Sequence, residues 1–340
     1  MVFSSPVLKL YRVAFSLGVC AICVISFAAR ADYSSHEKAP AFIQKMVEEH
    51  GFAKEDVISW LKAAEKKQSI LDAISRPAEK TKPWKDYRKI FLGQTRIDQG
   101  VEFWNKNQEI LRRASETLGV DEQVIVAIIG VETRYGRYMG KYRVLDALAT
   151  LGFDYKPRSK FFSKELEHFF LLAREQKQDP LSLKGSYAGA MGYGQFIPSS
   201  YRHYAIDFDN DGTADIWQNP VDAIGSVANY FKEHRWKKGE IVFSRARINA
   251  DYDKSALNER VRPHLSLDEV IAMGFSPVNT QLSGNEKVVP LLYEGQHGKE
   301  FWLGFDNFYV ITRYNRSQMY AMAVWQLSEE LRYTYERQLH

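Results

Sequence analysis

The chain has 340 residues, of which 45% are hydrophobic and 26% are charged. This balance is that of a folded globular protein and excludes a disordered chain, and the length allows two or three subdomains. The formal net charge is +4, but residues 1–31 contain Lys9, Arg12 and Arg30 and no acid, so the charge without them is +1. This small excess argues against a nucleic-acid-binding protein.

Residues 1–31 have the features of a secretory signal peptide. A basic start precedes an apolar run from Val13 to Ala29, and Ala29-Arg30-Ala31 supplies small residues before a polar stretch, so we expect cleavage after Ala31. The alternative is an uncleaved anchor, although the run is short for a membrane-spanning helix. Lipidation is not favoured, because no small residue directly precedes Cys20 or Cys23. Both cysteines lie in the signal, so the exported chain would have no disulfide and no cysteine metal site.

Helical patterns dominate the next two hundred or so residues. Apolar residues recur at helical spacing over 36–75, with a restart after Gly51, and a segment rich in proline and lysine over 76–85 predicts a connector. The next helical pattern extends from Gly100 to Leu118 and should end at Gly119. Asp121 is placed to cap a helix over Val124–Glu132, which is apolar on almost every side and predicts a buried core helix. Further helices are expected over 159–177 and 220–236.

The sequence changes character at Gly239. Short β-prone runs over 241–243, 288–292, 301–303 and 308–311 alternate with turn residues, a helix is expected over 266–273, and a final helix over 317–332. We therefore predict a mainly α (α+β) protein. Its expected parts are an N-terminal helical domain (32–97), a core (98–238), a small β-rich domain (239–306) and a C-terminal part of the core (307–340).

Glu132 is the first candidate for chemistry, because it ends the apolar helix. A poorly solvated carboxyl favours its neutral form, which raises its pKa, and general-acid catalysis on a glycosidic oxygen requires a proton that is kept near neutral pH. The alternative is a structural ion pair with Arg134 or Arg137. The helix pattern alone favours the ion pair, since structural pairs also perturb pKa values.

A glycine-rich segment over 185–201 is the second candidate. Four glycines around Ser186, Tyr187 and Gln195 would let the backbone approach a ligand while hydroxyls and an amide point into a groove. The alternative is a plain turn. The segment is too weak a match to support a nucleotide site, and no organic cofactor is indicated.

An acidic loop over 207–215 is the third candidate. Its acids occupy positions 1, 3, 5 and 9 of the EF-hand pattern, with Gly212 at position 6. Position 12 is Gln218 instead of the usual glutamate, and Asp222 could close a lengthened loop. The alternative is a solvated turn, but the spacing favours a structural Ca²⁺ site. The expected ligands are Asp207, Asp209, Asp211, Thr213 through its backbone carbonyl, Asp215 and Asp222.

A fourth segment, over 307–320, carries Tyr314, Asn315 and Tyr320. Such amphipathic groups stack on sugars and bond to their amides. By composition alone they could equally belong to the core.

These segments, in this order, resemble the membrane-bound lytic murein transglycosylase B family. The resemblance extends from about Phe42 to the C-terminus. It is most specific over 130–136, 148–155, 185–204, 222–231 and 312–317.

The resemblance implies a lysozyme-like helical core with an N-terminal helical domain and a small β-containing domain. In such enzymes one glutamic acid protonates the bond between N-acetylmuramic acid and N-acetylglucosamine, and then helps the muramoyl C6 hydroxyl attack C1, which leaves a 1,6-anhydro end. The matching position is Glu132, which overturns the ion-pair alternative, and the acidic loop aligns with the family's calcium-binding loop. The positions that match the family's groove are Arg158, Ser186, Gln195, Tyr230, Tyr314, Asn315 and Tyr320.

The expected partner is therefore the glycan strand of peptidoglycan, with cell-wall synthesis or divisome proteins as unidentified further candidates. We expect a periplasmic protein, either free or kept at the membrane by its signal segment. Two rival functions stay open. One is a hydrolytic muramidase on the same scaffold, and the other is a non-catalytic, calcium-stabilised protein that binds peptidoglycan.

Overall fold

We analysed a computed structural model, which describes residues 32–75, 82–279, 281–282 and 285–338. The predicted signal peptide and both cysteines lie outside these residues, as does most of the predicted connector. The described residues all belong to one compact unit. Within the described ranges, we find no helix with the length and apolar character needed to cross a membrane.

Three α-helices follow a short 3-10 helix (Tyr33–Ser35), as the pattern over 36–75 predicts. Gly51, with a φ of +65°, lies in the turn between the first two. Phe42 packs its ring against Phe153 and Phe170 at centroid distances of 6.0 Å, which attaches the first helix to residues more than a hundred positions later. The helices are α1 (Ala39–Glu48), α2 (Lys54–Ala63) and α3 (Gln68–Ile74).

The next four helices lead to the candidate residue Glu132. The pattern from Gly100 to Leu118 forms two helices instead of one, with a break at Asn107, whose side chain donates to the Phe103 carbonyl at 2.8 Å. Gly119 ends the second of them with a φ of +70°, as predicted. The helices are α4 (Trp84–Tyr87), α5 (Gln94–Lys106), α6 (Gln108–Leu118) and α7 (Glu122–Thr133).

The side chain of Asp121 does not cap α7 as predicted. Asp121 occupies the N-cap position but makes no side-chain cap bond. Its carboxylate accepts instead from the Trp236 indole at 2.8 Å and from the Gly239 backbone at 3.2 Å. A charge-assisted bond to a distant partner has replaced the local one.

The middle of the chain forms four helices and one short antiparallel strand pair. The predicted helix over 159–177 is α9, and that over 220–236 is α11. The helices are α8 (Val144–Ala149), which continues into a π-helical turn (Thr150–Asp154), α9 (Ser159–Glu175), α10 (Pro198–Tyr204) and α11 (Pro220–Glu233). The strands are β1 (Tyr142–Arg143) and β2 (Lys184–Gly185).

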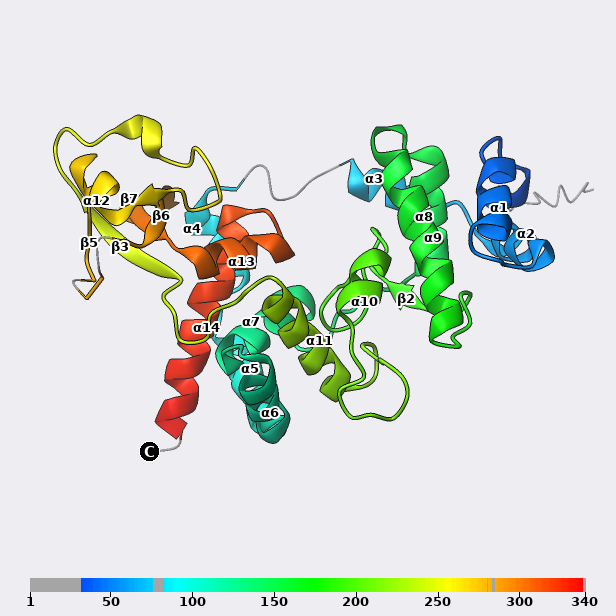
Figure 1. Ribbon diagram of the computed structural model, residues 1–340, viewed down its shortest axis with the longest axis horizontal. Helices are drawn as coiled ribbons and strands as arrows, with labels where there is room; N and C mark the ends of the chain where they lie inside the picture. Colours follow the sequence, from blue (N-terminus) through cyan, green and yellow to red (C-terminus); the bar gives the residue numbers. More distant parts are fainter. Residues whose placement is uncertain (1–31, 76–81, 280, 283–284, 339–340) are drawn as a thin grey trace, which may run out of the picture. The chain divides into compact units, whose positions relative to one another are not determined.

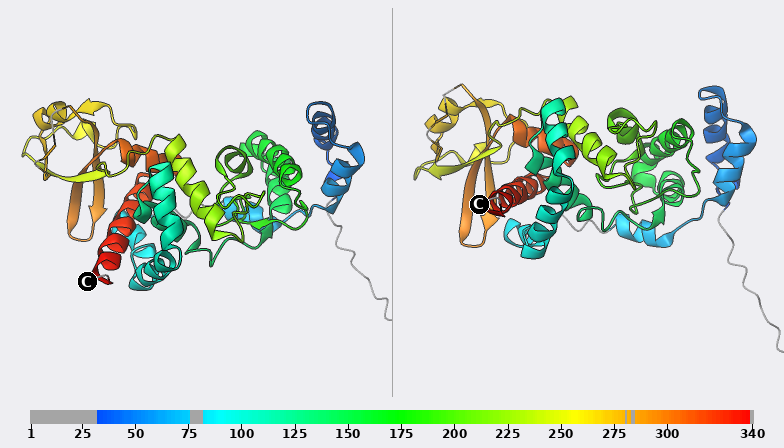
Figure 2. Two further views of the ribbon diagram at one scale, coloured as in Figure 1. Left: turned by 60° about the horizontal axis from the view of Figure 1, so that its bottom comes forward. Right: turned by 90° about the horizontal axis from the view of Figure 1, so that it is seen from below.

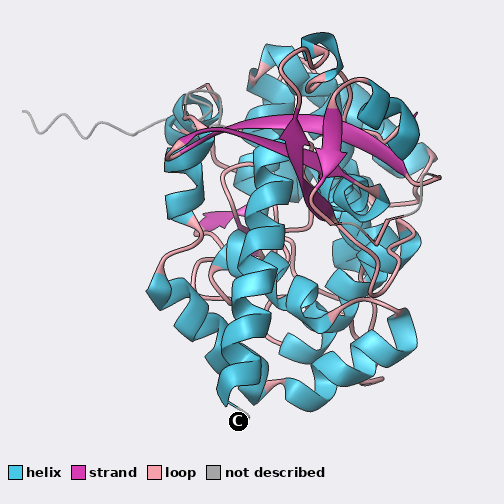
Figure 3. Ribbon diagram, turned by 90° about the vertical axis from the view of Figure 1, so that its left-hand side faces the viewer, coloured by secondary structure: helices cyan, strands magenta, loops and turns pink. Residues whose placement is uncertain are grey.

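The β-rich insert is a five-stranded antiparallel sheet in the order β4-β6-β7-β3-β5, which Figure 3 shows apart from the small β1–β2 pair. The predicted run over 241–243 is strand only at its last residue, where β3 begins. The sheet consists of β3 (Phe243–Ile248), β4 (Leu265–Ser266), β5 (Phe275–Pro277), β6 (Lys287–Gly295) and β7 (Gly298–Gly304), with α12 (Leu267–Ala272) between β4 and β5.

The predicted strand over 308–311 is wrong, because these residues lie in α13 (Asp306–Tyr314). Phe308, Val310 and Ile311 are all buried there, and packing of a helical face has overridden their β propensity. The last helix, α14 (Gln318–Gln338), continues beyond the predicted end at Arg332.

A large core joins the N-terminal helices to α14, and a smaller one lies beneath the sheet. Helix α7 is central to the large core, because α5, α6, α11 and α14 all pack against it. Figures 1 and 2 show α14, in red, alongside α5 and α7. The chain is therefore mainly helical with a small β-rich insert, as predicted.

Candidate active site and acidic loop

Glu132 lies in the last turn of α7 and is half-buried. Its Oε1 accepts a hydrogen bond of 2.5 Å from the hydroxyl of Tyr320, which lies 188 residues later on α14. Tyr320 is buried, and burial together with the charge of Glu132 raises the pKa of Tyr320 well above 10. The phenol is therefore neutral near pH 7 and keeps the proton that it donates to the carboxylate.

The backbone next to Glu132 is held by Thr133. Its hydroxyl donates to the Tyr193 carbonyl at 2.9 Å and accepts from the Gly136 backbone at 3.0 Å. Gly136 has a φ of +82°, and a Cβ there would lie 2.2 Å from the Tyr193 ring. Only glycine fits between this turn and the tyrosine.

Three arginines have contacts near the C-terminal end of α7. Arg96 donates to the Gly130 carbonyl, which also accepts from the Arg134 backbone at 3.1 Å. Arg134 donates to Gln99 at 2.6 Å, and Arg137 pairs with Glu102 at 3.6 Å. Arg134 and Arg137 are the two residues that the ion-pair alternative named, and both of these contacts are with α5.

The glycine-rich segment is a chain of turns. The Ser186 hydroxyl accepts from the backbone of Ala188 and Ala190 at 3.3 and 3.0 Å. Gln195, with a φ of +50°, donates from its amide to the carbonyls of Met139 and Gly192 at 3.2 and 3.0 Å. Both side chains are half-buried. The Ser186 contacts lie within the loop, and the Gln195 amide also joins the loop to Met139.

An aromatic cluster joins this loop to α11 and α13. The Tyr314 hydroxyl donates to the Gly194 carbonyl at 2.5 Å, and that of Tyr230 donates to the Arg313 carbonyl at 2.5 Å. The two rings lie 4.7 Å apart. Burial and then the charge of Glu132 raise the pKa of Tyr314 well above 10, so Tyr314 is within electrostatic range of that carboxylate.

Two predicted groove residues have contacts elsewhere. Asn315 ends α13, and its side chain accepts from the Ser317 backbone at 3.1 Å just before α14. Arg158 is exposed at the start of α9, with its guanidinium 4.2 Å from the Phe161 ring centre. It lines a hollow of about 910 Å³ between α1 and α9.

The structure thus joins Glu132 directly to Tyr320 and electrostatically to Tyr314. Tyr230 and Gln195 belong to the elements around Tyr314, while Ser186, Asn315 and Arg158 are set by their own local contacts. Sequence reasoning missed the supporting roles of Arg96 and Thr133. Thr133 lies in a motif that the sequence singled out, but its spacing gives no sign that the hydroxyl reaches Tyr193.

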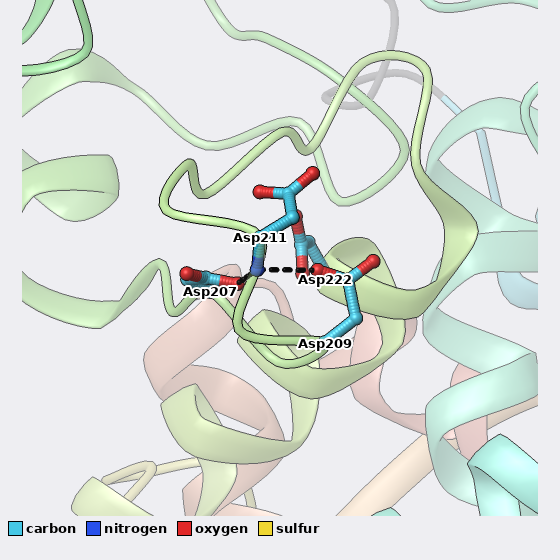
Figure 4. Close-up of side chains that lie close together, drawn as sticks. All are labelled: Asp207, Asp209, Asp211 and Asp222. Atoms are coloured by element: carbon cyan, nitrogen blue, oxygen red, sulfur yellow. Dashed lines mark hydrogen bonds between the residues drawn. The ribbon is translucent and has the colours of Figure 1, made fainter.

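Four carboxylates of the acidic loop converge, as Figure 4 shows. One oxygen from each of Asp207, Asp209, Asp211 and Asp222 lies within 4.8 Å of the others. Asp222 comes from the first turn of α11 and is buried. The loop turns sharply at Asn210 and Gly212, which have φ values of +62° and +95°.

Burial, neighbouring charges and hydrogen bonds shift the pKa values of two of these carboxyl groups. Burial raises the pKa of Asp222, and the charges of Asp209 and Asp207 raise it further. A hydrogen bond from Asn219 lowers the pKa of Asp209. Oxygen-only donors of this kind suit a hard cation such as Ca²⁺.

The other two predicted ligands have different surroundings. Asp215 lies outside the group of four, and its carboxylate accepts from the backbone of Trp217 and Gln218 at 2.8 and 2.9 Å. The backbone N–H of Thr213 donates to Asp211 at 2.9 Å. The carboxylates that converge therefore include Asp222 and leave out Asp215.

Comparison with known proteins connects these features to a family. The transglycosylase SLT domain model matches residues 34–329. The chain is 46% identical over 308 residues to membrane-bound lytic murein transglycosylase B of Escherichia coli (strain K12), covering 88% of this chain and 83% of that protein.

Solved structures agree with this match. The chain is similar to catenated lytic transglycosylase SltB1 of Pseudomonas aeruginosa, with 54% identity and a TM-score of 0.86 over 89% of this chain and all of that one. It is also similar to Escherichia coli lytic transglycosylase Slt35 in complex with calcium, with 44% identity and a TM-score of 0.82 over 89% of this chain and 95% of that one. The predicted lysozyme-like fold and family are confirmed. The chain belongs to the transglycosylase SLT-domain family and is a lytic transglycosylase, an enzyme that acts on peptidoglycan.

Proposed function

We propose that Glu132 is the acid/base catalyst with which this chain cleaves the bond between N-acetylmuramic acid and N-acetylglucosamine and forms 1,6-anhydromuramoyl ends. The observation that carries this proposal is the 2.5 Å bond from Tyr320 to a carboxyl at the end of a buried helix. Such a group is partly shielded from water and has a neutral donor on one oxygen.

The first step uses Glu132 as an acid. Its proton passes to the glycosidic oxygen, the bond between that oxygen and C1 breaks, and positive charge develops at C1 in an oxocarbenium-like transition state. The carboxyl becomes a carboxylate, and the hydrogen bond from Tyr320 becomes charge-assisted at that moment. Because Oε1 accepts this bond, the transferred proton is best placed on Oε2.

The second step uses the same carboxylate as a base. It takes the proton of the muramoyl C6 hydroxyl while O6 forms a bond to C1, which regenerates the acid and leaves no water in the product. Ordinary glycosidases need a second carboxylate for the nucleophile or for water. An intramolecular hydroxyl already held near C1 has a large effective molarity, so it replaces both.

A second acid is therefore not required. Asp154, which the sequence offers as one candidate for a second acid, accepts from Tyr33 at 2.6 Å and from Lys66 at 3.1 Å. These contacts favour a structural role for Asp154.

The remaining groove residues are proposed substrate contacts on the strength of the family resemblance. The Tyr320 hydroxyl bonds to Glu132, and the hydroxyl and amide groups of the others bond to backbone. Each would bind sugar through lone pairs still available on its side-chain oxygen, except Arg158, which would do so through its guanidinium. The residues are Arg158, Ser186, Gln195, Tyr230, Tyr314, Asn315 and Tyr320.

We also propose that the acidic loop binds Ca²⁺ and that the ion has a structural role. Four carboxylate oxygens within 4.8 Å of one another repel strongly, and a divalent cation would offset that repulsion and fix the loop to α11. Asp207, Asp209, Asp211 and Asp222 would hold the ion. The predicted ligands Asp215 and Thr213 would join them only after a local change.

A periplasmic location is part of the proposal. It is supported by the signal-like residues 1–31 and by the substrate, which lies in the cell envelope. Whether the signal is retained as an anchor would be decided by N-terminal sequencing of the exported protein.

Mass spectrometry of purified peptidoglycan treated with the exported chain tests the reaction. We expect anhydromuramic ends, and reducing ends would instead identify a hydrolytic muramidase. Glu132→Gln should abolish cleavage and retain binding to glycan strands. Glu122→Gln, at the opposite end of α7 where the carboxylate bonds to Trp104 at 3.0 Å, is the control and should cleave normally. Wild-type cleavage by Glu132→Gln would refute the assignment.

A further inference from the structure

A basic hollow of about 450 Å³ lies between the end of α11, helix α13 and the loop that carries Arg262 (elements labelled in Figure 1). Arg235, Arg262 and Arg313 line it, and all three side chains are exposed. Tyr309 forms part of its wall. The guanidinium carbons of Arg262 and Arg313 lie 5.8 and 6.0 Å from the centre of the Tyr309 ring.

Two acids line the hollow, Glu233 and Asp306, and neither forms an ion pair with these arginines in the described part of the chain. Asp306 pairs with Lys237 at 2.9 Å. None of the ion pairs found in the part of the chain that the structure describes includes Arg235, Arg262 or Arg313. Burial lowers the pKa of His234, which also lines the hollow, so the imidazole is neutral at pH 7. With Lys237 paired to Asp306, three guanidinium groups face the single remaining carboxylate of Glu233, so the hollow has a net positive charge.

Unpaired guanidinium groups around one hollow favour a planar oxyanion. The fork of arginine N–H donors matches the two oxygens of a carboxylate, and contact with an aromatic ring restricts the guanidinium before the ligand arrives. We propose that this hollow binds a carboxylate of a peptide stem carried by the glycan strand. The proposal rests on the proposed function, because the strand that brings the carboxylate is the substrate assigned there.

The hollow is connected to the proposed catalytic residue by one aromatic cluster. His234 stacks on the Tyr230 ring at 4.1 Å, and Tyr230 bonds to the Arg313 carbonyl at 2.5 Å. Tyr230 also contacts Tyr314, whose pKa is raised in part by the charge of Glu132. A strand bound at Glu132 could therefore place a stem peptide over the hollow, which would make this chain favour strands that carry peptides.

Binding measurements on the inactive Glu132→Gln protein test this inference without any bond cleavage. The probes are a tetrasaccharide of alternating N-acetylglucosamine and N-acetylmuramic acid with tripeptide stems, and the same tetrasaccharide without them. We expect Arg262→Ala and Arg313→Ala each to weaken binding of the peptide-bearing probe roughly tenfold, as for the loss of one charged hydrogen-bond partner. Binding of the peptide-free probe should stay unchanged.

Arg337→Ala is the matched control, because Arg337 is also exposed with its guanidinium 5.5 Å from a tyrosine ring, on α14. It should bind both probes normally. Thermal melting verifies that each variant is folded, and Arg262, in a loop, provides a variant that leaves α13 intact. Unchanged binding in the arginine variants, or an equal loss for both probes, would overturn the proposal. So would displacement of the peptide-bearing probe by inorganic phosphate at concentrations where acetate has no effect. A wild-type protein that binds selectively but cleaves nothing would instead count against the proposed function.

Discussion

Replacing Tyr320 with phenylalanine tests the geometry of the proposed catalytic site most directly. The change removes one oxygen and leaves the buried ring in place, so the packing of α14 on α7 should be kept. What is lost is the donor that lies 2.5 Å from Glu132 Oε1. Any effect on the reaction should therefore come from that bond.

The size of the effect follows from when the bond is strongest. In the resting acid the acceptor is a neutral carboxyl, and as the proton leaves it becomes a carboxylate. A hydrogen bond to a charged group contributes about 1.5–3 kcal/mol, against about 1 kcal/mol for a neutral pair. Because only the difference between transition state and ground state changes the rate, a loss of about 1–2 kcal/mol predicts that kcat falls roughly 5- to 30-fold. KM should change little.

The assay is release of anhydromuropeptides from purified peptidoglycan, with initial rates measured over a range of substrate concentrations. Tyr335→Phe is the matched control, since Tyr335 is another buried tyrosine of α14, stacked on Trp104 at 4.4 Å. It should have wild-type kinetics. If Tyr320→Phe also had a wild-type kcat, the hydrogen bond would have no part in the transition state, and the reasoning would be wrong.

Two further predictions concern the surroundings of the site. Gly130→Ala should lower stability by about 1–3 kcal/mol in chemical unfolding, because its Cβ would lie 2.7 Å from the Tyr135 ring, whereas Gly93→Ala, with no atom within 4 Å, should have almost no effect. A chelator should lower Tm, and Asp209→Asn should remove that response; calcium at 100 times its Kd would add about 2.7 kcal/mol. The folded-state pKa of Asp222 is raised above 3.8, so its proton adds stability below pH 3.8 that is lost as the pH rises through the raised value. The calcium-dependent rise in Tm should therefore grow over that pH range, and a rise that is constant with pH would contradict it.

Local patterns in the sequence predicted most helices, because a buried helix requires apolar residues at a fixed spacing. They failed where a distant partner decides the outcome. The run over 308–311 has β-prone residues, yet it is helical because its buried face packs within the core beside α14. Asp121 has the residue type and position of a cap, but Trp236 and Gly239 take its oxygens. Neither partner can be inferred from the residues next to it.

The site itself shows the same division between local and distant information. Glu132 stands out in the sequence because a single carboxyl ends an apolar helix, whereas composition alone left Tyr320 equally suited to core and groove. In the structure Tyr320 is both buried and bonded to Glu132. The same side chain therefore packs α14 into the core and contacts the proposed catalytic residue on α7. The proposed acid is therefore positioned by a helix that begins 186 residues later, at Gln318. Changes that loosen the packing of α14 on α7 should reduce cleavage before they unfold the protein, since the hydrogen bond depends on the distance between these two helices.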